Sequence, residues 1–388
     1  MMEIQNETLA ALSVDGRGSY GIGASAVERS EKLYTYLRIT DIRDDGTINF
    51  ADLKSVDDEK AAQYLLKPND IVFARTGAST GRNYFYDGTD GEFVYAGFLI
   101  KFSIDPNKVN PKYVKYYCMS DAYKGWIHSF NTGSTRGNIN AQTLGRMPVP
   151  IPPRPQQDGI VDILSCLDEK IRENTKINEN LTELLQTVYQ ERFGDASMVA
   201  DKGILSDICS YSRDRVAVSE LDVSNYFSTE NMLPGKAGAT EATSLPTSSQ
   251  TTACHKGDTL ISNIRPYFKK IVYCENDCGC STDVLCFTPV LPKYSAYLFS
   301  TLYNDKFFAF MVAGSKGTKM PRGDKQQIMS YPVVIPSDDE LNEFNAFALP
   351  ILAQLHSNKA ENKSLSVTRD TLLPKLVSGE INVSGVQL

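Results

Sequence analysis

Apolar residues recur at alternating intervals of three and four along residues 156–193, a segment without proline and with one glycine near its start. This spacing is the heptad pattern of a helix that packs against another helix. Two asparagines interrupt the apolar face, and each buried amide needs a hydrogen-bond partner on the facing helix. The sequence therefore predicts one long helix with the seam Leu164, Leu167, Ile171, Asn174, Asn178, Leu181, Leu185 and Val188.

The same seam recurs 184 residues further along the chain, with asparagines at the same two places. Asn358 and Asn362 match Asn174 and Asn178, so we predict that the two helices pack on each other and that the four amides fix their register. The second seam consists of Ala348, Ile351, Leu355, Asn358, Asn362, Leu365, Arg369 and Leu372.

Other landmarks repeat in the same order, which indicates an internal duplication. The proline-rich segment 148–152 matches 332–336, Asn110–Tyr113 matches Leu291–Tyr294, and Lys67–Val72 resembles Lys256–Leu260. The residue patterns predict strands at 70–74, 93–102 and 258–261, and helices at 113–120 and 294–310.

The predicted fold class is therefore α+β: two similar globular domains separated by two long antiparallel coiled-coil helices, with a pseudo-twofold repeat. The tail, residues 379–388, corresponds to residues 195–204, which lead into the second domain. We therefore predict that the tail completes the first domain. The predicted boundaries are 1–152 for the first domain, 153–194 for the central helix, 195–336 for the second domain, 337–378 for the C-terminal helix and 379–388 for the tail.

Composition narrows the functional classes. With 41% hydrophobic residues and 8 cysteines among 388 residues, the chain can build cores and is no disulfide scaffold. No apolar run approaches the roughly 18 residues of a membrane span, and the polar N-terminus is no secretory signal. We expect a cytoplasmic protein without membrane contact. The net charge is −7, yet residues 256–325 hold 10 basic and 6 acidic residues, and such a local basic face can bind phosphates.

Two motifs suggest enzymes, and both are weak. Gly16–Gly21 fits the G-x-G-x-x-G pattern of nucleotide-binding loops, which requires a helix to open at the third glycine. Cys274, Cys278, Cys280 and Cys286 could hold zinc, but they lack paired C-x2-C knuckles. Two interpretations that do not involve DNA recognition remain open. One is a zinc- or nucleotide-dependent enzyme, and the other is a coiled-coil scaffold. No convincing nucleophile or phosphate loop is present, which favours a non-catalytic protein.

Two loops in each half combine glycine or small polar residues with arginine or lysine. Glycine lets the backbone approach a ligand, hydroxyl groups bond phosphate, and arginine reads guanine edges bidentately. Their recurrence at equivalent places in both halves predicts DNA contact. The candidates are Arg75, Thr76, Ser79, Thr80, Arg82, Arg136 and Asn138 in the first half, and Arg265, Lys269, Lys270, Lys316, Lys319 and Arg322 in the second.

The helical regions resemble a known family. The run Pro148–Pro153, Gln156–Gln157, Ile160–Leu164, Leu167–Ile171 and Asn178–Leu181 is similar to the central region of type I restriction–modification specificity (S) subunits. Arg369–Ile381 is similar to their C-terminal end. The resemblance spans nearly the whole chain, and the two helices are its most specific part.

The resemblance implies that each domain reads one half of a split site in double-stranded DNA. The two helices would act as a rigid spacer that sets the distance between the half-sites. The chain would bind no cofactor of its own. It would direct two methyltransferase (M) subunits, which hold S-adenosylmethionine, to one adenine in each half-site. Restriction (R) subunits would add DNA cleavage that depends on ATP and Mg²⁺.

Overall fold

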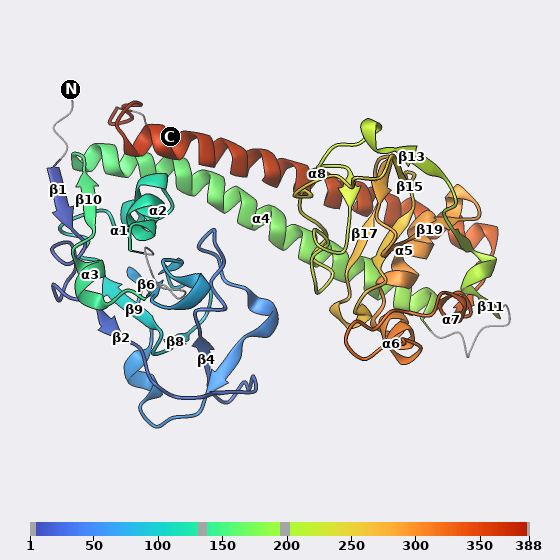
Figure 1. The fold of residues 1–388 in the computed structure, drawn as a ribbon, viewed down its shortest axis with the longest axis horizontal. Helices are drawn as coiled ribbons and strands as arrows, with labels where there is room; N and C mark the ends of the chain where they lie inside the picture. The colour runs from blue at the N-terminus through green and yellow to red at the C-terminus, as the bar shows by residue number, and fades with distance from the viewer. Residues whose placement is uncertain (1–4, 131–137, 195–201, 386–388) are drawn as a thin grey trace. The chain divides into compact units, whose positions relative to one another are not determined.

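The structure is a computed structural model that describes residues 5–130, 138–194 and 202–385. The chain forms two compact units (Figure 1). Unit 1 consists of Met1–Ile171 and Lys363–Leu388, and unit 2 of Arg172–Asn362. The N- and C-terminal segments of the chain therefore belong to the same unit.

The core of unit 1 is an antiparallel sheet whose central strand, β6, has all five side chains buried. A strand that is buried throughout and apolar except for Asp70 is expected where helices or a second sheet cover both faces. Tyr113 and Tyr116, from a short helix, are fully buried in the same apolar cluster as Ile71 and Phe73 of this strand. The sheet order is β2 (Ser19–Tyr20), β9 (Leu99–Ser103), β6 (Asp70–Ala74) and β7 (Asn83–Tyr86). The accompanying helices are α1 (Pro111–Tyr117), α2 (Asp121–His128) and α3 (Ala141–Gly145).

Two further strand groups complete unit 1. A four-stranded sheet contains one parallel pair, β4 with β8, at its end. A separate antiparallel pair joins the first strand of the chain to the proline-rich strand that precedes the long helix. These strands are β3 (Ala26–Val27), β5 (Lys54–Val56), β4 (Tyr34–Leu37) and β8 (Phe93–Tyr95), then β1 (Gln5–Thr8) and β10 (Pro148–Ile151).

Unit 2 repeats this plan with one change. Its core sheet and its separate strand pair have the same order as in unit 1, but in the other sheet the parallel strand β14 lies outside β18 rather than inside it. The strands are β12 (Cys209–Tyr211), β19 (Val284–Pro289), β16 (Thr259–Ser262) and β17 (Ile271–Tyr273); β13 (Arg215–Ala217), β15 (Gln250–Cys254), β18 (Cys278–Cys280) and β14 (Tyr226–Phe227); and β11 (Lys202–Ile204) with β20 (Pro332–Val334).

Two of the predicted elements are divided in the structure. The predicted helix over 294–310 is two helices, α5 (Ser295–Tyr303) and α6 (Asp305–Ala313), and a short α7 (Lys325–Met329) follows. The break falls at Asn304, whose side chain accepts a hydrogen bond from the Lys306 amide and so starts a new helix. The predicted strand over 93–102 is interrupted between β8 and β9 by a turn that contains Gly97.

The two long helices are present and pack antiparallel. They are α4 (Arg154–Phe193) and α8 (Asp338–Val377). In unit 2 the Asn174 amide donates to Asn362 Oδ1 at 2.9 Å, and the Asn358 amide donates to Asn178 Oδ1 at 2.8 Å. The residue numbers of the hydrogen-bonded partners fall along α8 as they rise along α4, so the two helices run antiparallel. Each seam asparagine therefore has a partner on the other helix.

The unit 1 ends of α4 and α8 are joined by an ionic cluster around Asp168. Its carboxylate accepts hydrogen bonds from Lys115 Nζ at 2.8 Å, from the Tyr116 hydroxyl at 2.9 Å, and from Arg369 Nη1 of α8 at 3.1 Å. Burial alone would raise the pKa of the Asp168 carboxyl, but the Lys115 ammonium and the Arg369 guanidinium outweigh burial and lower it. At the seam position of Arg369, an ion pair with Asp168 therefore takes the place of an apolar contact.

This cluster makes stability depend on pH. The pKa of Asp168 is lower in the folded protein than in the unfolded chain, where it is about 3.9, so its contribution is complete above that value. We predict that the contribution is lost as pH falls through the lower, folded pKa. In urea titrations, the stability difference between the wild type and Asp168→Asn should shrink below about pH 4. A difference that stays constant down to about pH 2 would contradict the prediction.

The tail lies on the first turns of α4, within unit 1. The Gln156 side chain accepts from the Val383 amide at 2.8 Å and donates to the Ile381 carbonyl at 3.0 Å. The Val383 side chain is buried in the same apolar cluster as Leu164 and Leu376. Gly159 contributes because a Cβ there would approach the Val383 carbonyl to 2.7 Å. Residues 379–385 thus pack against the beginning of α4.

Candidate nucleic-acid interface

The two loops proposed in each half of the sequence meet in space. In unit 1 the loop that follows β6 forms an antiparallel bridge from Thr76 to Asn138, and the Ile139 amide donates to the Arg75 carbonyl at 2.9 Å. In unit 2 the loop that follows β16 forms the equivalent bridge from Ile264 to Arg322. We call these composite surfaces loop pair 1 (75–82 with 138–140) and loop pair 2 (262–270 with 314–322). Each brings together residues roughly 60 positions apart in the chain.

Arg75 is the central cation of loop pair 1. Its guanidinium stacks over the Tyr20 ring at 4.9 Å, and the Tyr20 hydroxyl accepts a hydrogen bond from the Ala141 amide at 3.1 Å. The Arg75 Nε is buried and has no hydrogen-bond partner among the described residues. Its amide donates to the carbonyl of Phe98, whose ring is 61% exposed. The guanidinium thus lies against the Tyr20 ring and has no carboxylate partner in the described part of the chain.

Arg265 lies in the same loop of loop pair 2, one residue after the bridge residue Ile264, whereas Arg75 lies one residue before Thr76. Its amide donates to the Pro321 carbonyl at 2.8 Å, which ties the two loops together. Its backbone has the left-handed φ of 50°, which is uncommon for a residue with a side chain. Like Arg75, it has a buried Nε without a hydrogen-bond partner in the described ranges. Each arginine therefore lies next to the bridge residue of its loop and has an unsatisfied nitrogen.

Most of the other basic candidates are paired with acids. Arg82 binds both oxygens of Asp44, at 2.6 and 3.1 Å, so its fork is occupied. Lys270 Nζ donates to the Thr229 carbonyl at 2.6 Å. The remaining pairs are Lys269 with Asp305 at 3.0 Å, Lys316 with Asp324 at 2.6 Å and Arg322 with Asp283 at 2.9 Å. A phosphate would have to compete with these carboxylates, which the sequence could not reveal.

The small polar candidates differ in their surroundings. The Thr80 hydroxyl donates to the Gly77 carbonyl and closes the single-turn 3-10 helix Gly77–Ser79. Ser79 belongs to this helix, and Thr76 directly precedes it. Asn138 and Lys319 are exposed. Arg136 lies outside the described residues.

Residues that the sequence reading did not select also form these surfaces. They are aromatic or apolar side chains that stay exposed beside the arginines: Tyr20, Phe98, Tyr267, Phe268 and Met320. Tyr267 and Phe268 were within a proposed loop and could have been found as two adjacent aromatics in a basic segment. Tyr20 is far from Arg75 in sequence, and no local pattern connects them.

The structure does not support nucleotide binding at Gly16–Gly21. The segment contains strand β2 and opens no helix, so it offers no helix N-terminus to a phosphate. A Cβ on Gly18 would lie 2.7 Å from the Phe102 ring, and one on Gly21 would lie 2.2 Å from the Tyr95 carbonyl. Gly18 is thus required by packing against the core sheet, and Gly21 by its close approach to the backbone at the end of β8.

The cysteines form part of a small core in unit 2. Cys274, Cys278, Cys280 and Cys286 are buried together with Leu260 and Val284. The Cys286 thiol lies 3.2 Å from Asp258 Oδ2, and burial raises the pKa of the Asp258 carboxyl. No group of three or more His, Cys, Asp or Glu side chains in the described ranges is arranged to hold a metal ion. The zinc-enzyme interpretation is therefore not supported.

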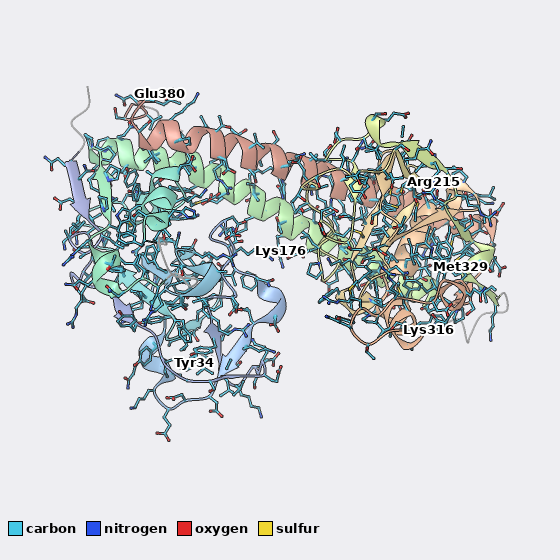
Figure 2. The ribbon with its side chains drawn as sticks, viewed as in Figure 1. Tyr34, Lys176, Arg215, Lys316, Met329 and Glu380 are labelled. Atoms are coloured by element: carbon cyan, nitrogen blue, oxygen red, sulfur yellow. The ribbon has the colours of Figure 1, made fainter. Side chains whose placement is uncertain are left out.

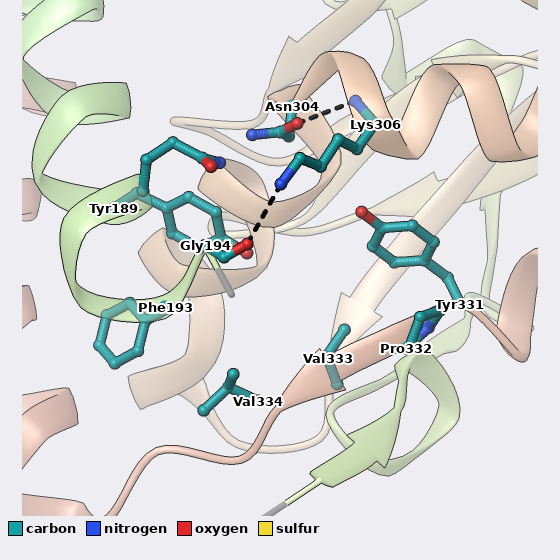
Figure 3. A pocket seen from close by; sticks show the side chains of 10 residues that line it. Tyr189, Phe193, Gly194, Asn304, Lys306, Tyr331, Pro332, Val333 and Val334 are labelled. Atoms are coloured by element: carbon teal, nitrogen blue, oxygen red, sulfur yellow. Dashed lines mark hydrogen bonds between the residues drawn. The ribbon is translucent and has the colours of Figure 1, made fainter. Parts of the chain in front are cut away.

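A pocket of about 250 Å³ lies at the C-terminal end of α4, within unit 2 (Figure 3). Aromatic and aliphatic side chains line it, among them Tyr189, Phe193 and Val333. Lys306 is the one charged side chain in this lining, and its Nζ donates to the Gly194 carbonyl at 3.3 Å. The lysine thus satisfies an end carbonyl of α4, and the described lining carries no carboxylate or thiol for catalysis.

The chain is similar to known specificity subunits. Residues 28–183 match the type I restriction modification DNA specificity domain. The HindI specificity subunit of Haemophilus influenzae is 26% identical over 163 residues, which are 41% of this chain and 35% of that protein. The MjaIX specificity subunit of Methanocaldococcus jannaschii is 21% identical over 324 residues, or 72% of this chain and 71% of that one. The chain thus matches about a third of the length of the HindI subunit.

The fold agrees with these matches. The S subunit of a type I restriction–modification system from M. genitalium has a TM-score of 0.55 at 18% identity, covering 97% of this chain and 96% of that one. The chain is similar to the specificity subunits of type I restriction–modification systems in the sequence of residues 28–183 and in its fold. The family resemblance drawn from the residues is confirmed.

No helix of the described residues is long and apolar enough to cross a membrane.

Proposed function

We propose that this chain is the DNA-specificity subunit of a type I restriction–modification complex and is not itself catalytic. Each unit would bind one half of a bipartite site in double-stranded DNA through its loop pair. One observation carries the proposal: in both units an equivalent β-bridge joins the loop that carries the arginine to the second candidate loop. Each joined surface centres on an arginine, Arg75 or Arg265, that has no acidic partner among the described residues. Such an arginine can offer its fork to a guanine edge or a phosphate.

The partners follow from the same proposal. Two methyltransferase subunits would carry S-adenosylmethionine and modify one adenine in each half-site, and restriction subunits would use ATP and Mg²⁺. The antiparallel helices α4 and α8 would set the spacing of the half-sites. The amide pairs between Asn174 and Asn362, and between Asn358 and Asn178, support this role because buried polar pairs specify register. The proposed site of action is the cytoplasm.

A methylation map tests the function. The chain, co-expressed with its methyltransferase subunits in a host that lacks the system, should add N6-methyladenine at one split motif on both strands. Omission of the chain should remove every added methyl group, because the methyltransferase would have no target. Unaltered methylation with and without the chain, in cells where the complex forms, would contradict the proposal.

We predict that Arg75→Ala and Arg265→Ala each weaken binding to a duplex carrying the mapped motif. A good bidentate contact to a base contributes about 1–3 kcal/mol, so affinity should fall roughly 5- to 150-fold. Fluorescence anisotropy of the full complex at fixed salt would measure it. Arg215→Ala is the matched control in unit 2, because Arg215 lies on β13, on the opposite side of unit 2 from Lys316 in Figure 2. Equal affinity of Arg75→Ala, Arg265→Ala and the control would contradict the prediction.

A further inference from the structure

Loop pair 2 carries two adjacent aromatic rings at its surface. They are Tyr267, 50% exposed, and Phe268, 38% exposed, and their ring centroids are 4.8 Å apart. Both belong to the single-turn 3-10 helix Pro266–Phe268. Large apolar groups exposed side by side on a loop are unusual unless they contact a partner.

The backbone beneath the rings is fixed by the surrounding structure. The flanking residues Arg265 and Lys269 both have left-handed φ angles, of 50° and 51°. The Gly235 amide donates to the Phe268 carbonyl at 2.8 Å, and the Lys236 amide donates to the Lys269 carbonyl at 2.9 Å. Strained conformations persist where neighbouring contacts determine them, and they cluster at functional sites. The rings are therefore presented on a preorganised turn.

Positive charge surrounds the same turn. Arg265 precedes it and Lys269 follows it, and Lys270 Nζ lies 6.0 Å from the Phe268 ring centroid. The acidic partner of Lys269 is Asp305, whose carboxylate Lys236 Nζ also contacts at 2.7 Å. A base stack flanked by phosphates offers both an aromatic face and negative charge, and it fits a turn that has rings at its tip and cations at its base.

Loop pair 1 has no such feature at the equivalent turn. There the 3-10 helix is Gly77–Ser79, with the sequence Gly-Ala-Ser. The pair of aromatic rings on this turn is therefore present in unit 2 and not in unit 1, and the fold that the units share does not require it.

We propose that Tyr267 and Phe268 form an aromatic wedge that enters the base stack of the half-site bound by unit 2 and unstacks one base step. The proposal rests on the proposed function, since it requires that unit 2 bind duplex DNA. Apolar side chains that enter between base pairs unstack and kink the duplex. The half-site of unit 2 would then favour an easily unstacked pyrimidine–purine step at the wedge, read through deformability rather than through base edges.

The test uses the complete complex and duplexes that carry the mapped motif with 2-aminopurine at successive positions. This adenine analogue fluoresces more strongly when it is unstacked. We expect a rise at one step, in one half-site only. Tyr267→Ser with Phe268→Ser should abolish the rise and lower affinity roughly 5- to 150-fold. Tyr267→Phe should keep both, because the ring remains. Leu291→Ser, which removes an exposed apolar side chain elsewhere in unit 2, should also keep both.

The outcomes separate the two proposals. Anisotropy that shows tight, specific binding without a fluorescence rise at any position would overturn the wedge and leave the proposed function standing. A rise that persists in the double serine variant would also overturn it, since another group would then unstack the DNA. Absence of specific binding by the wild-type complex would overturn both. Because the rings are exposed, the double variant should melt at the wild-type temperature, and this checks its fold.

Discussion

Replacing Asp168 with alanine should lower the apparent free energy of unfolding by about 2–4 kcal/mol. The substitution leaves the Arg369 guanidinium, 14% exposed, and the Lys115 ammonium without their shared carboxylate, although Arg369 keeps its pair with the exposed Asp370 at 3.0 Å. Removing one partner of a fully buried pair costs about 3–5 kcal/mol. We expect somewhat less because the Asp168 side chain is 20% exposed and water can screen part of the remaining charge.

Asp44→Ala is the matched control for Asp168→Ala. Asp44 also pairs with an arginine, Arg82, through two hydrogen bonds, but its side chain is 84% exposed. Exposed ion pairs contribute about 0–1 kcal/mol, so Asp44→Ala should have a small effect. Urea titration followed by circular dichroism at neutral pH would measure both variants. Equal losses in the two would show that burial in the seam does not determine the strength of the Asp168 cluster.

The long helices were predictable from the sequence because their signal is repeated over many turns. The heptad seam of 156–193 corresponds to α4, and each of Asn174 and Asn178 was expected to find an amide on the other helix, as it does. The duplication allowed the second helix to be recognised even though Arg369 occupies a seam position. Long-period patterns survive such local exceptions, which is why the fold class could be reached without coordinates.

Shorter elements depend on local competition that periodicity does not record. Residues 294–310 have helical texture throughout, yet the cap formed by Asn304 divides them into α5 and α6. The strand order of the smaller sheets differs between the units although their sequence landmarks match. Here the choice between neighbouring strands depends on tertiary packing, which outweighs local propensity.

The candidate interface was predicted in its parts but not in its assembly. The sequence selected both loops of each half, and only the structure shows that they are joined at Thr76–Asn138 and at Ile264–Arg322. It also shows which cations are already paired with acids, such as Arg82 with Asp44. Pairing across the fold joins residues distant in sequence, so composition alone cannot distinguish an available arginine from an occupied one.

Deletion of residues 379–388 should destabilise unit 1 by about 3 kcal/mol. The deletion removes the buried Val383 side chain, whose burial contributes about 1.5–3 kcal/mol, and both hydrogen bonds of Gln156 to the tail. It also uncovers the first turns of α4 next to Leu376. Hydrogen–deuterium exchange should therefore increase at the start of α4 while the core of unit 2, around β16 and α5, stays protected.

Two point variants separate loss of packing from mere shortening of the chain. Val383→Ser should reproduce much of the effect, about 2 kcal/mol, because the side chain is 4% exposed. Val367→Ser makes the same chemical change at a side chain of α8 that is 59% exposed, and should cost under about 0.5 kcal/mol. Unchanged melting after the deletion would mean that the tail is not part of unit 1. Because the tail corresponds to residues 195–204, which lead into the second domain, a destabilised unit 1 would support the view that the tail completes the first domain of the duplicated fold.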